Sequence, residues 1–207
     1  STQNKETNIM AISIMNSSTS GNPPHGLNKV NANTFTYWQY VDTLVYWGGS
    51  SGEGLIVPPS PDVVDAAHKN GVRVLGTVFM PQTAHGGKME WLEDLLVKNE
   101  DGSYPVADKL IEVAQTYGFE GWFMNQETEG TDEEPLTADH AARMQQFIQY
   151  FKEQAPDLDL VYYDSMTVDG KMDWQNALTE ENLAYLVSED GDPVADAMFL
   201  NFWWTSD

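Results

Sequence analysis

The stretch "PVADKLIEVAQTYGFEGWFMNQE", residues 105–127, decides the class of fold. Its first half, 105–118, places apolar residues on one face of a helix, begins with proline and stops at Gly118. Its second half is an almost unbroken apolar run, which is typical of a strand buried on both faces. An amphipathic helix that leads directly into such a strand predicts an α/β fold with a parallel sheet.

The same alternation continues on both sides of that stretch. Apolar, β-branched runs predict further strands over 8–15, 40–47, 72–79, 158–165 and 197–205. Apolar stripes with capping residues predict helices over 61–70 and 89–99, from Thr137 to the residue before Pro156, and, after Thr179, over the short segment 180–187. The segment after the first strand and the "GGSSGEG" segment, 48–54, are predicted as loops.

Two architectures cover a parallel sheet with helices in this way, an open doubly wound sheet and a closed barrel. No strand is followed by GxGxxG or GxxxxGK[ST], so nucleotide-binding versions of the open sheet lose support. A (β/α)8 barrel takes roughly 250 residues, whereas this chain has 207. A barrel would therefore lack its last strands here.

Composition excludes several classes of partner. The chain has 32 acidic and 10 basic residues and a net charge of -22, so it has few groups to neutralise phosphates. We expect neither nucleic acid nor a membrane surface as a partner. No apolar run approaches membrane-spanning length. The absence of Cys excludes disulfides and thiolate metal sites.

Cellular location is left open by these features. A chain without Cys fits an exported bacterial protein as well as a cytosolic one. The start, "STQNKETNIM", has no initiator Met and no signal-peptide profile, and it reads as the inside of a longer precursor. We expect an extracellular or bacterial cell-surface location in preference to the cytoplasm.

Asn125 and Glu127 stand at the close of the strand in 119–127. They lie two residues apart, so in a strand they project from one face together with Phe123. The carboxyl ends of parallel strands are where α/β proteins build their active sites. Burial among aromatic residues raises the pKa of a Glu towards that of a general acid at neutral pH. The pair therefore indicates glycosidase chemistry.

A second carboxylate is absent from the position where a two-carboxylate glycosidase would have it, because Asn125 stands there. A substrate with a 2-acetamido group can supply the nucleophile itself, since the acetamido oxygen can attack the anomeric carbon and form an oxazoline. An Asn side chain is suited to hold the acetamido N–H. The alternative is that Asn125 and Glu127 simply bond to loop backbone at the end of a strand.

Longer segments carry a family resemblance. "EGWFMNQE", 120–127, resembles the DGxDxDxE strand of family 18 chitinases, with Phe123 and Asn125 in place of two Asp and Glu127 at the acid. The segment 36–79, from "TYWQYVDTLVYW" to "GVRVLGTVF", together with 104–128, is similar to family 85 glycoside hydrolases. The similarity covers roughly residues 8 to 205.

That resemblance implies a (β/α)8 TIM barrel with about six of its eight strands in this chain. It also implies an endo-β-N-acetylglucosaminidase that cuts the β-1,4 bond between the two core N-acetylglucosamines of Asn-linked glycans, with possible transfer of the glycan to another acceptor. By the same resemblance Glu127 matches the acid/base and Asn125 the residue that orients the acetamido group. Tyr163 matches a Tyr that hydrogen-bonds the acetamido oxygen, with Tyr162 as the adjacent alternative.

Further sugar-site residues are expected around these three. Trp174 and Trp203 with Phe202 match aromatic residues that line the sugar site in the family, Trp204 being the alternative to Trp203. Sugars stack on such rings. From their places at the ends of predicted strands or in the following loop, we add Trp47, Asp164 and His85.

No cofactor and no metal are expected, because the four His lack ligand spacing and the acidic runs lack a calcium-loop register. Residues 1–207 are expected to form a catalytic barrel without the β-rich accessory domains of the family, the missing strands coming from another segment or chain. Two alternative functions stay open, a glycan-binding barrel without turnover and a chitinase-like hydrolase. The preferred glycan, high-mannose or complex, is not predicted.

Overall fold

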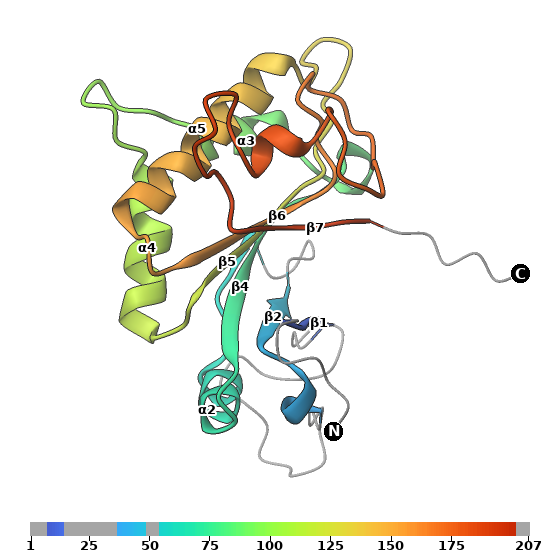
Figure 1. Ribbon diagram of the computed structural model, residues 1–207. Helices are drawn as coiled ribbons and strands as arrows, with labels where there is room; N and C mark the ends of the chain where they lie inside the picture. The colour runs from blue at the N-terminus through green and yellow to red at the C-terminus, as the bar shows by residue number, and fades with distance from the viewer. Residues whose placement is uncertain (1–7, 15–36, 49–53, 202–207) are drawn as a thin grey trace, which may run out of the picture.

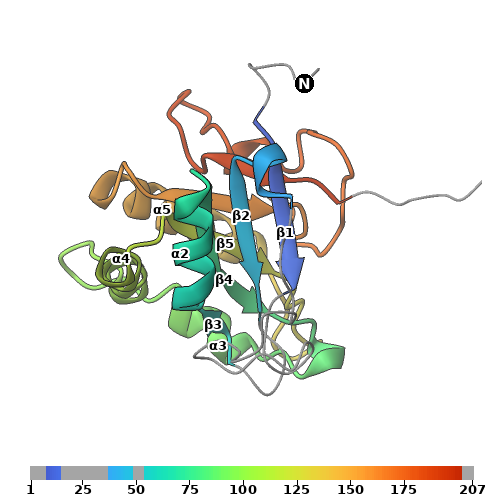
Figure 2. The ribbon, with the colours of Figure 1, turned by 90° about the horizontal axis from the view of Figure 1, so that it is seen from below.

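A computed structural model describes residues 8–14, 37–48 and 54–201. Its centre is a parallel sheet whose strands lie in the order β1-β2-β4-β5-β6-β7, with β3 paired antiparallel to β4 (Figure 1). The strands are Met10–Ile14 (β1), Thr43–Trp47 (β2), Ile56–Val57 (β3), Arg73–Met80 (β4), Gly121–Gln126 (β5), Asp159–Tyr163 (β6) and Ala197–Phe199 (β7). Strand direction changes steadily across the sheet, which is curled into part of a barrel (Figures 1 and 2).

Helices connect the parallel strands and lie on the outer side of the curled sheet (Figure 1). The α-helices are Pro61–Lys69 (α2), Met89–Leu95 (α3), Pro105–Tyr117 (α4) and Ala138–Gln154 (α5). Short 3-10 turns occupy Trp38–Tyr40 (η1), Thr83–His85 (η2) and Leu183–Tyr185 (η3). In the described segments no helix is long and apolar enough to cross a bilayer.

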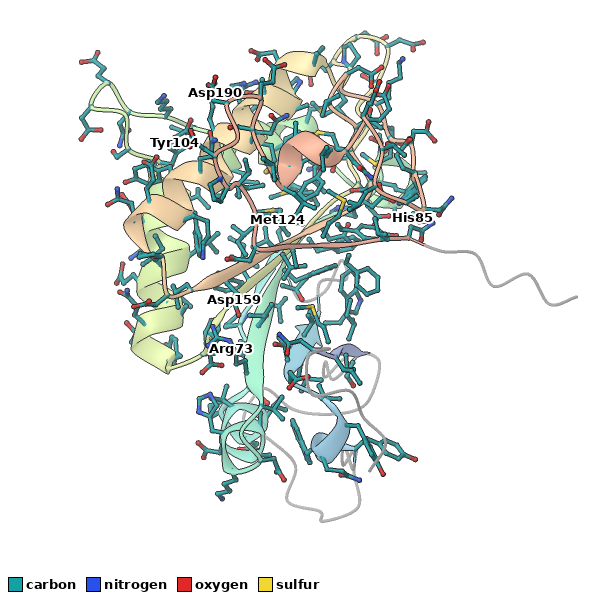
Figure 3. All side chains as sticks on the ribbon, viewed as in Figure 1. Arg73, His85, Tyr104, Met124, Asp159 and Asp190 are labelled. Atoms are coloured by element: carbon teal, nitrogen blue, oxygen red, sulfur yellow. The ribbon has the colours of Figure 1, made fainter. Side chains whose placement is uncertain are left out.

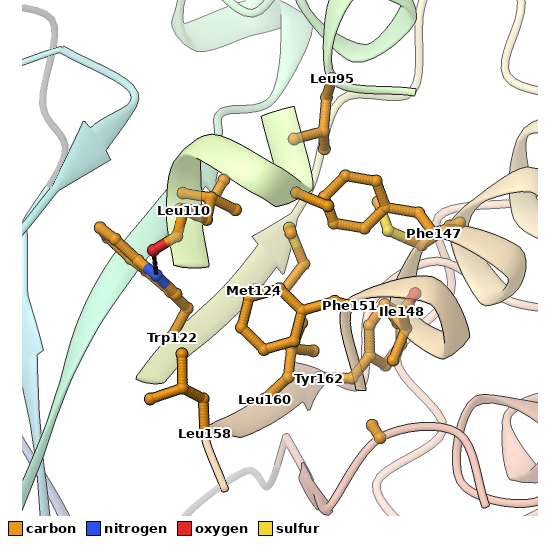
Figure 4. Packing of buried hydrophobic residues seen from close by; sticks show 14 of the residues in the cluster. Leu95, Leu110, Trp122, Met124, Phe147, Ile148, Phe151, Leu158, Leu160 and Tyr162 are labelled. Atoms are coloured by element: carbon orange, nitrogen blue, oxygen red, sulfur yellow. Dashed lines mark hydrogen bonds between the residues drawn. The ribbon is translucent and has the colours of Figure 1, made fainter. Parts of the chain in front are cut away.

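The helix-facing side of β5 and β6 forms the larger core. Trp122 and Met124 of β5 project into it, and Phe147 and Phe151 of α5 pack over them (Figure 4). The indole N–H of Trp122 donates to the backbone oxygen of Leu110 at 2.9 Å, which ties α4 to the strand below it. These side chains are almost completely buried, so this layer supplies most of the apolar burial that stabilises the fold.

The inner side of the sheet carries a smaller cluster of Val45, Leu75, Phe123 and Val161, one from each of four neighbouring parallel strands. Phe123 therefore faces inward while its neighbours face the helices. The predicted alternation along this strand is confirmed.

Gly121 permits the close pairing of β5 with β6. Its φ of 147° is in the region that favours glycine, and a Cβ there would lie 1.9 Å from the backbone oxygen of Asp159. Gly121 pairs with Asp159 of β6 on one side and with Leu75 of β4 on the other, so it stands at the start of both strand pairings that place the end of β5. The site described below sits at that end.

Three predictions about individual elements need correction, and one short strand was not predicted. The helix expected over 89–99 ends at Leu95, and the helix expected over 180–187 is only the turn η3. That turn stops because Val187 enters an antiparallel bridge with Pro193. Strand β7 is described as 197–199, and 202–205 of the predicted strand lie outside the described residues. Strand β3 was not predicted, since two residues before a proline pair carry no periodicity.

Candidate active site

The chain just beyond β5 is held by its neighbours. The backbone N–H of Glu127 donates to the oxygen of Met80 at 2.8 Å. The buried side chain of Gln126 bonds both the N–H and the oxygen of Thr128, at 3.0 and 2.8 Å. Ser165, after β6, donates to the backbone oxygen of Gln126 at 2.5 Å. Three neighbouring strand ends are thereby locked together, so the side chain of Glu127 starts from a fixed backbone.

Asn125 and Glu127 lie together, as the strand alternation predicts. Asn125 is only 2% exposed, and its Nδ2 donates to Oε2 of Glu127 at 3.4 Å. Its Oδ1 is buried and has no hydrogen-bond partner among the described residues. A buried carbonyl without a donor is costly. The site therefore presents an acceptor that a ligand N–H can satisfy.

Glu127 has the electrostatics of a proton donor. Burial raises the pKa of its carboxyl above the usual value, although hydrogen bonds from Asn125 and Gln82 and a positive charge on His85 act in the opposite direction. A negative charge on Glu129 adds to the increase in pKa. The groups that bond Glu127 are thus neutral amides, which leave it available as a general acid.

Tyr163 ends β6 beside this pair. It is half-buried, and its hydroxyl donates to Oδ1 of Asn201 at 3.0 Å. Burial, and next the charge of Glu127, raise the pKa of Tyr163 to about 12, while a hydrogen bond with the Trp174 side chain opposes the shift. Tyr163 is therefore a neutral phenol close to Glu127 and Trp174.

Aromatic rings line the inner wall next to these groups. The ring centroid of Trp47 lies 5.4 Å from that of Phe79 and 5.8 Å from that of Phe123. Phe123 in turn lies 6.1 Å from Tyr163 and 5.8 Å from Phe199. Phe123 is buried at 1% exposure, whereas the rings around it are partly exposed, and such rings suit the C–H face of a sugar.

Asp164 is buried at 1% exposure rather than open to the site. One of its carboxylate oxygens accepts from the backbone N–H of Gln175 at 3.3 Å and from Nδ2 of Asn182 at 3.0 Å. The other accepts from the N–H of Asn176 at 2.8 Å. Asp164 therefore anchors the loop that carries Trp174, and the structure does not bring it to the group of Glu127 and Tyr163.

His85 lies at the end of η2, exposed, near the carboxyl ends of the strands (Figure 3). A positive charge on His85 acts to lower the pKa of Glu127. Trp203 and Phe202 lie outside the described residues.

Two functional candidates were not predicted from the sequence. Gln82 bonds Glu127, and Asn201 bonds Tyr163. Gln82 follows the strand predicted over 72–79, and Asn201 is the one amide within the apolar strand predicted over 197–205, which is the only sequence signal that either gives. Within the described segments, no group of three or more His, Asp or Glu could hold a metal ion.

Comparison with known proteins places the chain in a family. The model described as Glycosyl hydrolase family 85 matches residues 15–207. The chain belongs to family 85. Among curated members, "Cytosolic endo-beta-N-acetylglucosaminidase" of Mus musculus is 33% identical over 186 residues, 88% of this chain and 23% of the relative. "Cytosolic endo-beta-N-acetylglucosaminidase 2" of Arabidopsis thaliana is 33% identical over 172 residues, 81% of this chain and 22% of the relative.

A solved family 85 relative confirms the fold. The glycoside hydrolase domain of Spr0440, Endo-D from Streptococcus pneumoniae R6, matches with a TM-score of 0.82 and 35% identity. The match covers 97% of this chain and 31% of the solved chain. The prediction of a partial (β/α)8 TIM barrel is therefore confirmed. The chain spans under a third of that solved chain and under a quarter of the two curated relatives.

The expected extracellular or cell-surface location is wrong by these comparisons. The curated family 85 relatives from mouse, Arabidopsis, chicken and human are named cytosolic. The absence of Cys could not decide the location, because it fits a cytosolic protein as well as an exported one.

Proposed function

We propose that this chain is the catalytic barrel of an endo-β-N-acetylglucosaminidase that acts on Asn-linked glycans and glycoproteins. The bond cut is the β-1,4 bond between the two core N-acetylglucosamines. Support comes from family 85 membership and from the activity that the mouse and Arabidopsis relatives carry in their names. In this proposal residues 1–207 supply about six barrel strands, and another segment or chain supplies the rest.

One observation carries the mechanism: the unpaired Oδ1 of Asn125 lies beside a carboxyl whose pKa is raised. Oδ1 accepts the N–H of the substrate's 2-acetamido group, which turns the acetamido oxygen towards the anomeric carbon. Glu127 donates its proton to the glycosidic oxygen while the acetamido oxygen attacks, and an oxazolinium ion, which keeps the N–H bonded to Asn125, and a free sugar hydroxyl result. Glu127, now a carboxylate, takes a proton from the water that opens the oxazolinium ring. The anomeric configuration is retained.

The surrounding residues bind and polarise the same sugar. Tyr163 donates its hydroxyl hydrogen to the acetamido oxygen, which stabilises charge as the oxazoline forms. Rings from the aromatic wall and the neighbouring loop pack against the sugar faces; these are Trp47, Trp174, Phe202 and Trp203. His85 lies at the rim, and Asp164 acts through the loop that it holds. When a sugar hydroxyl replaces water in the second step, the product is a transferred glycan.

The direct test uses a high-mannose and a complex-type glycoprotein with the full-length protein. The proposal predicts that mass spectrometry finds a single N-acetylglucosamine left on Asn. Binding of the glycan with no product over hours would support a glycan-binding barrel instead. Cleavage of chitin oligomers but not of the glycoproteins would support a chitinase-like hydrolase.

Asn125→Ala tests the oxazoline step separately. The variant should lose hydrolysis of the natural glycan but still consume a preformed glycan oxazoline, because that substrate no longer needs its acetamido group to be oriented. An equal loss on both substrates would contradict the role of Asn125.

Glu129 supports the one competing mechanism, since its charge reaches Glu127. In a two-carboxylate mechanism Glu129 would be the nucleophile or base. However, Glu129 is exposed, and its Oε2 already accepts from the backbone N–H of Thr83 at 3.1 Å. We expect Glu129→Gln to retain glycan release within about tenfold, whereas a nucleophile loses several orders of magnitude. Loss on that larger scale would favour the two-carboxylate mechanism.

A further inference from the structure

A chain of amide groups links the hydroxyl of Tyr163 to the loop that carries Trp174. The hydroxyl of Tyr163 donates to Oδ1 of Asn201 at 3.0 Å. Nδ2 of Asn201 donates to Oδ1 of Asn176 at 3.0 Å, and Nδ2 of Asn176 donates to the backbone oxygen of Trp174 at 3.4 Å. The chain of bonds thus starts at Tyr163 and ends at the backbone of Trp174. The side chain of Trp174 bonds Tyr163, so the chain closes into a ring.

The direction of every bond in this chain follows from its last member. A backbone oxygen only accepts, so Asn176 must turn its NH₂ group towards Trp174 and its Oδ1 towards Asn201. Asn201 must then donate through its NH₂ group and offer Oδ1 to Tyr163. The hydroxyl of Tyr163 has to donate, and its oxygen is left to accept from the indole N–H. The two amides therefore fix where the hydrogen of Tyr163 points.

Asn176 is held in place independently of its side chain. Its φ is 59°, a left-handed conformation that Asn tolerates better than most residues. Its backbone N–H donates to the carboxylate of Asp164 at 2.8 Å, and Asp164 is 1% exposed. The far end of the amide chain is thus fixed to the buried end of β6, while its near end bonds Tyr163.

We propose that Asn201 and Asn176 are positioning residues that hold the hydroxyl of Tyr163 and the side chain of Trp174 in one arrangement before substrate binds. This inference rests on the proposed function, in which Tyr163 donates to the acetamido oxygen. In the resting site that hydrogen is directed at Asn201. Substrate binding therefore exchanges the acceptor of that hydrogen from Asn201 to the substrate, and the phenol that Asn201 has ordered beforehand is already in place to donate it, so loss of Asn201 lowers kcat.

The test is a double-mutant cycle on glycan release by the full-length protein. Asn201→Ala should lower kcat about threefold to tenfold and change KM by less than about twofold, the range expected for one hydrogen bond. In a Tyr163→Phe background the same substitution should change kcat by less than about twofold, because the hydroxyl that it positions is already absent. Equal effects in the two backgrounds, or no effect in either, would overturn the proposal.

Asn176→Gly is the second variant, in case Asn201→Ala does not fold. Glycine keeps the left-handed backbone and the N–H that bonds Asp164, so only the amide is lost. Its effect should have the same sign and should also vanish in the Tyr163→Phe background. Gln175→Ala is the matched control, because Gln175 lies in the same loop but bonds Thr179 instead. Its effect on kcat should be equal in both backgrounds, and a hydroxyl-dependent effect would contradict the assignment.

A second readout separates this inference from the proposed function. In protein labelled with ¹³Cζ-tyrosine, the signal missing in Tyr163→Phe identifies Tyr163, and its shift at neutral pH reports hydrogen bonding of the hydroxyl. Asn201→Ala should move this signal and Gln175→Ala should not. If the signal moves but no glycan is cut by the wild-type protein, the amide chain stands and the function fails. An unmoved signal overturns the amide chain itself.

Discussion

Two glutamates flank strand β5 and meet different surroundings. Glu120, before the strand, accepts at 2.7 Å from the backbone N–H of Val74 and lies 2.7 Å from Nε2 of His68. Glu127, after the strand, is bonded by the side-chain amides of Asn125 and Gln82, and burial raises its pKa. Two residues of the same type thus differ in role: Glu120 is a structural link at the amino end of the strand, and Glu127 is a reactive group at its carboxyl end.

The neighbours of the two glutamates follow the same division. At the amino ends of the strands, Nε of Arg73 lies 2.8 Å from Oδ2 of Asp159. In Figure 3 these two residues lie at the opposite end of the strands from His85. Lys152 pairs with Asp196 at 3.0 Å, and Asp196 also accepts from the N–H of Leu160. At the carboxyl end, Glu127 is instead bonded by neutral amides, and aromatic rings lie on the inner side of the sheet. Stability and chemistry are therefore assigned to opposite ends of one sheet.

The largest expected effect is that of Glu127→Gln on the rate of glycan release. Loss of the general acid should lower glycan release by about 10²–10⁴-fold, with little change in the free energy of unfolding, because no ion pair is broken. Release rates and urea unfolding curves measure the two quantities. Activity close to that of the wild type would contradict the assignment of Glu127 as the general acid.

Glu120→Gln should show the reverse pattern. The substitution removes a negative charge from the contact with His68 and should reduce the free energy of unfolding by about 1 kcal/mol. Glycan release by the folded protein should stay within about twofold of the wild type, since the change lies at the opposite end of the strand. Unchanged stability together with lost release would contradict the structural role.

Gln82→Leu should shift the pH dependence without abolishing activity. The hydrogen bond from Gln82 lowers the pKa of Glu127, so its removal raises that pKa further. The acid form is lost as pH rises through this pKa, and the basic limb of kcat/KM should move to higher pH, by less than about one unit. Glu129→Gln is the matched control of opposite sign, because loss of its charge moves the limb to lower pH. Shifts in the same direction would contradict both assignments.

The smallest effect concerns a paired carboxylate outside the sheet. Bonds from Arg143 and His140 lower the pKa of Glu93 to about 2, against an unfolded value of 4.5. Its stabilising contribution is therefore complete above about pH 4.5 and is lost as pH falls towards 2. Glu93 is about half exposed, so we expect less than about 1 kcal/mol. Glu93→Gln should reduce the fall in the free energy of unfolding between pH 7 and 2, and Glu90→Gln, on the same helix, should not.

Much of the fold follows from local sequence patterns. The helix at 105–117 and strand β5 were predictable because an apolar stripe and an apolar run differ in period, and Gly118 separates them. The short helix expected after Thr179 is only a 3-10 turn, because the chain folds back directly after it and Val187 pairs with Pro193.

The site was predictable only where a residue stands in a pattern. Asn125 and Glu127 could be found because strand alternation brings them together. Gln82 and Asn201 are neutral amides in loops, and nothing in their own neighbourhood marks them until the fold sets them against Glu127 and Tyr163. The buried, loop-holding place of Asp164 likewise depends on partners 11 to 18 residues further along the chain.

The unpaired carbonyl of Asn125 lowers the stability of the fold, yet catalysis requires it. Such a group costs about 1–3 kcal/mol, a sizeable part of the 5–15 kcal/mol typical of a native protein. Asn125→Leu should therefore melt at a higher temperature than the wild type and be catalytically dead. Engineering that screens this fold for heat resistance alone will drift towards such inert proteins, so a screen must reward bond cleavage in every round.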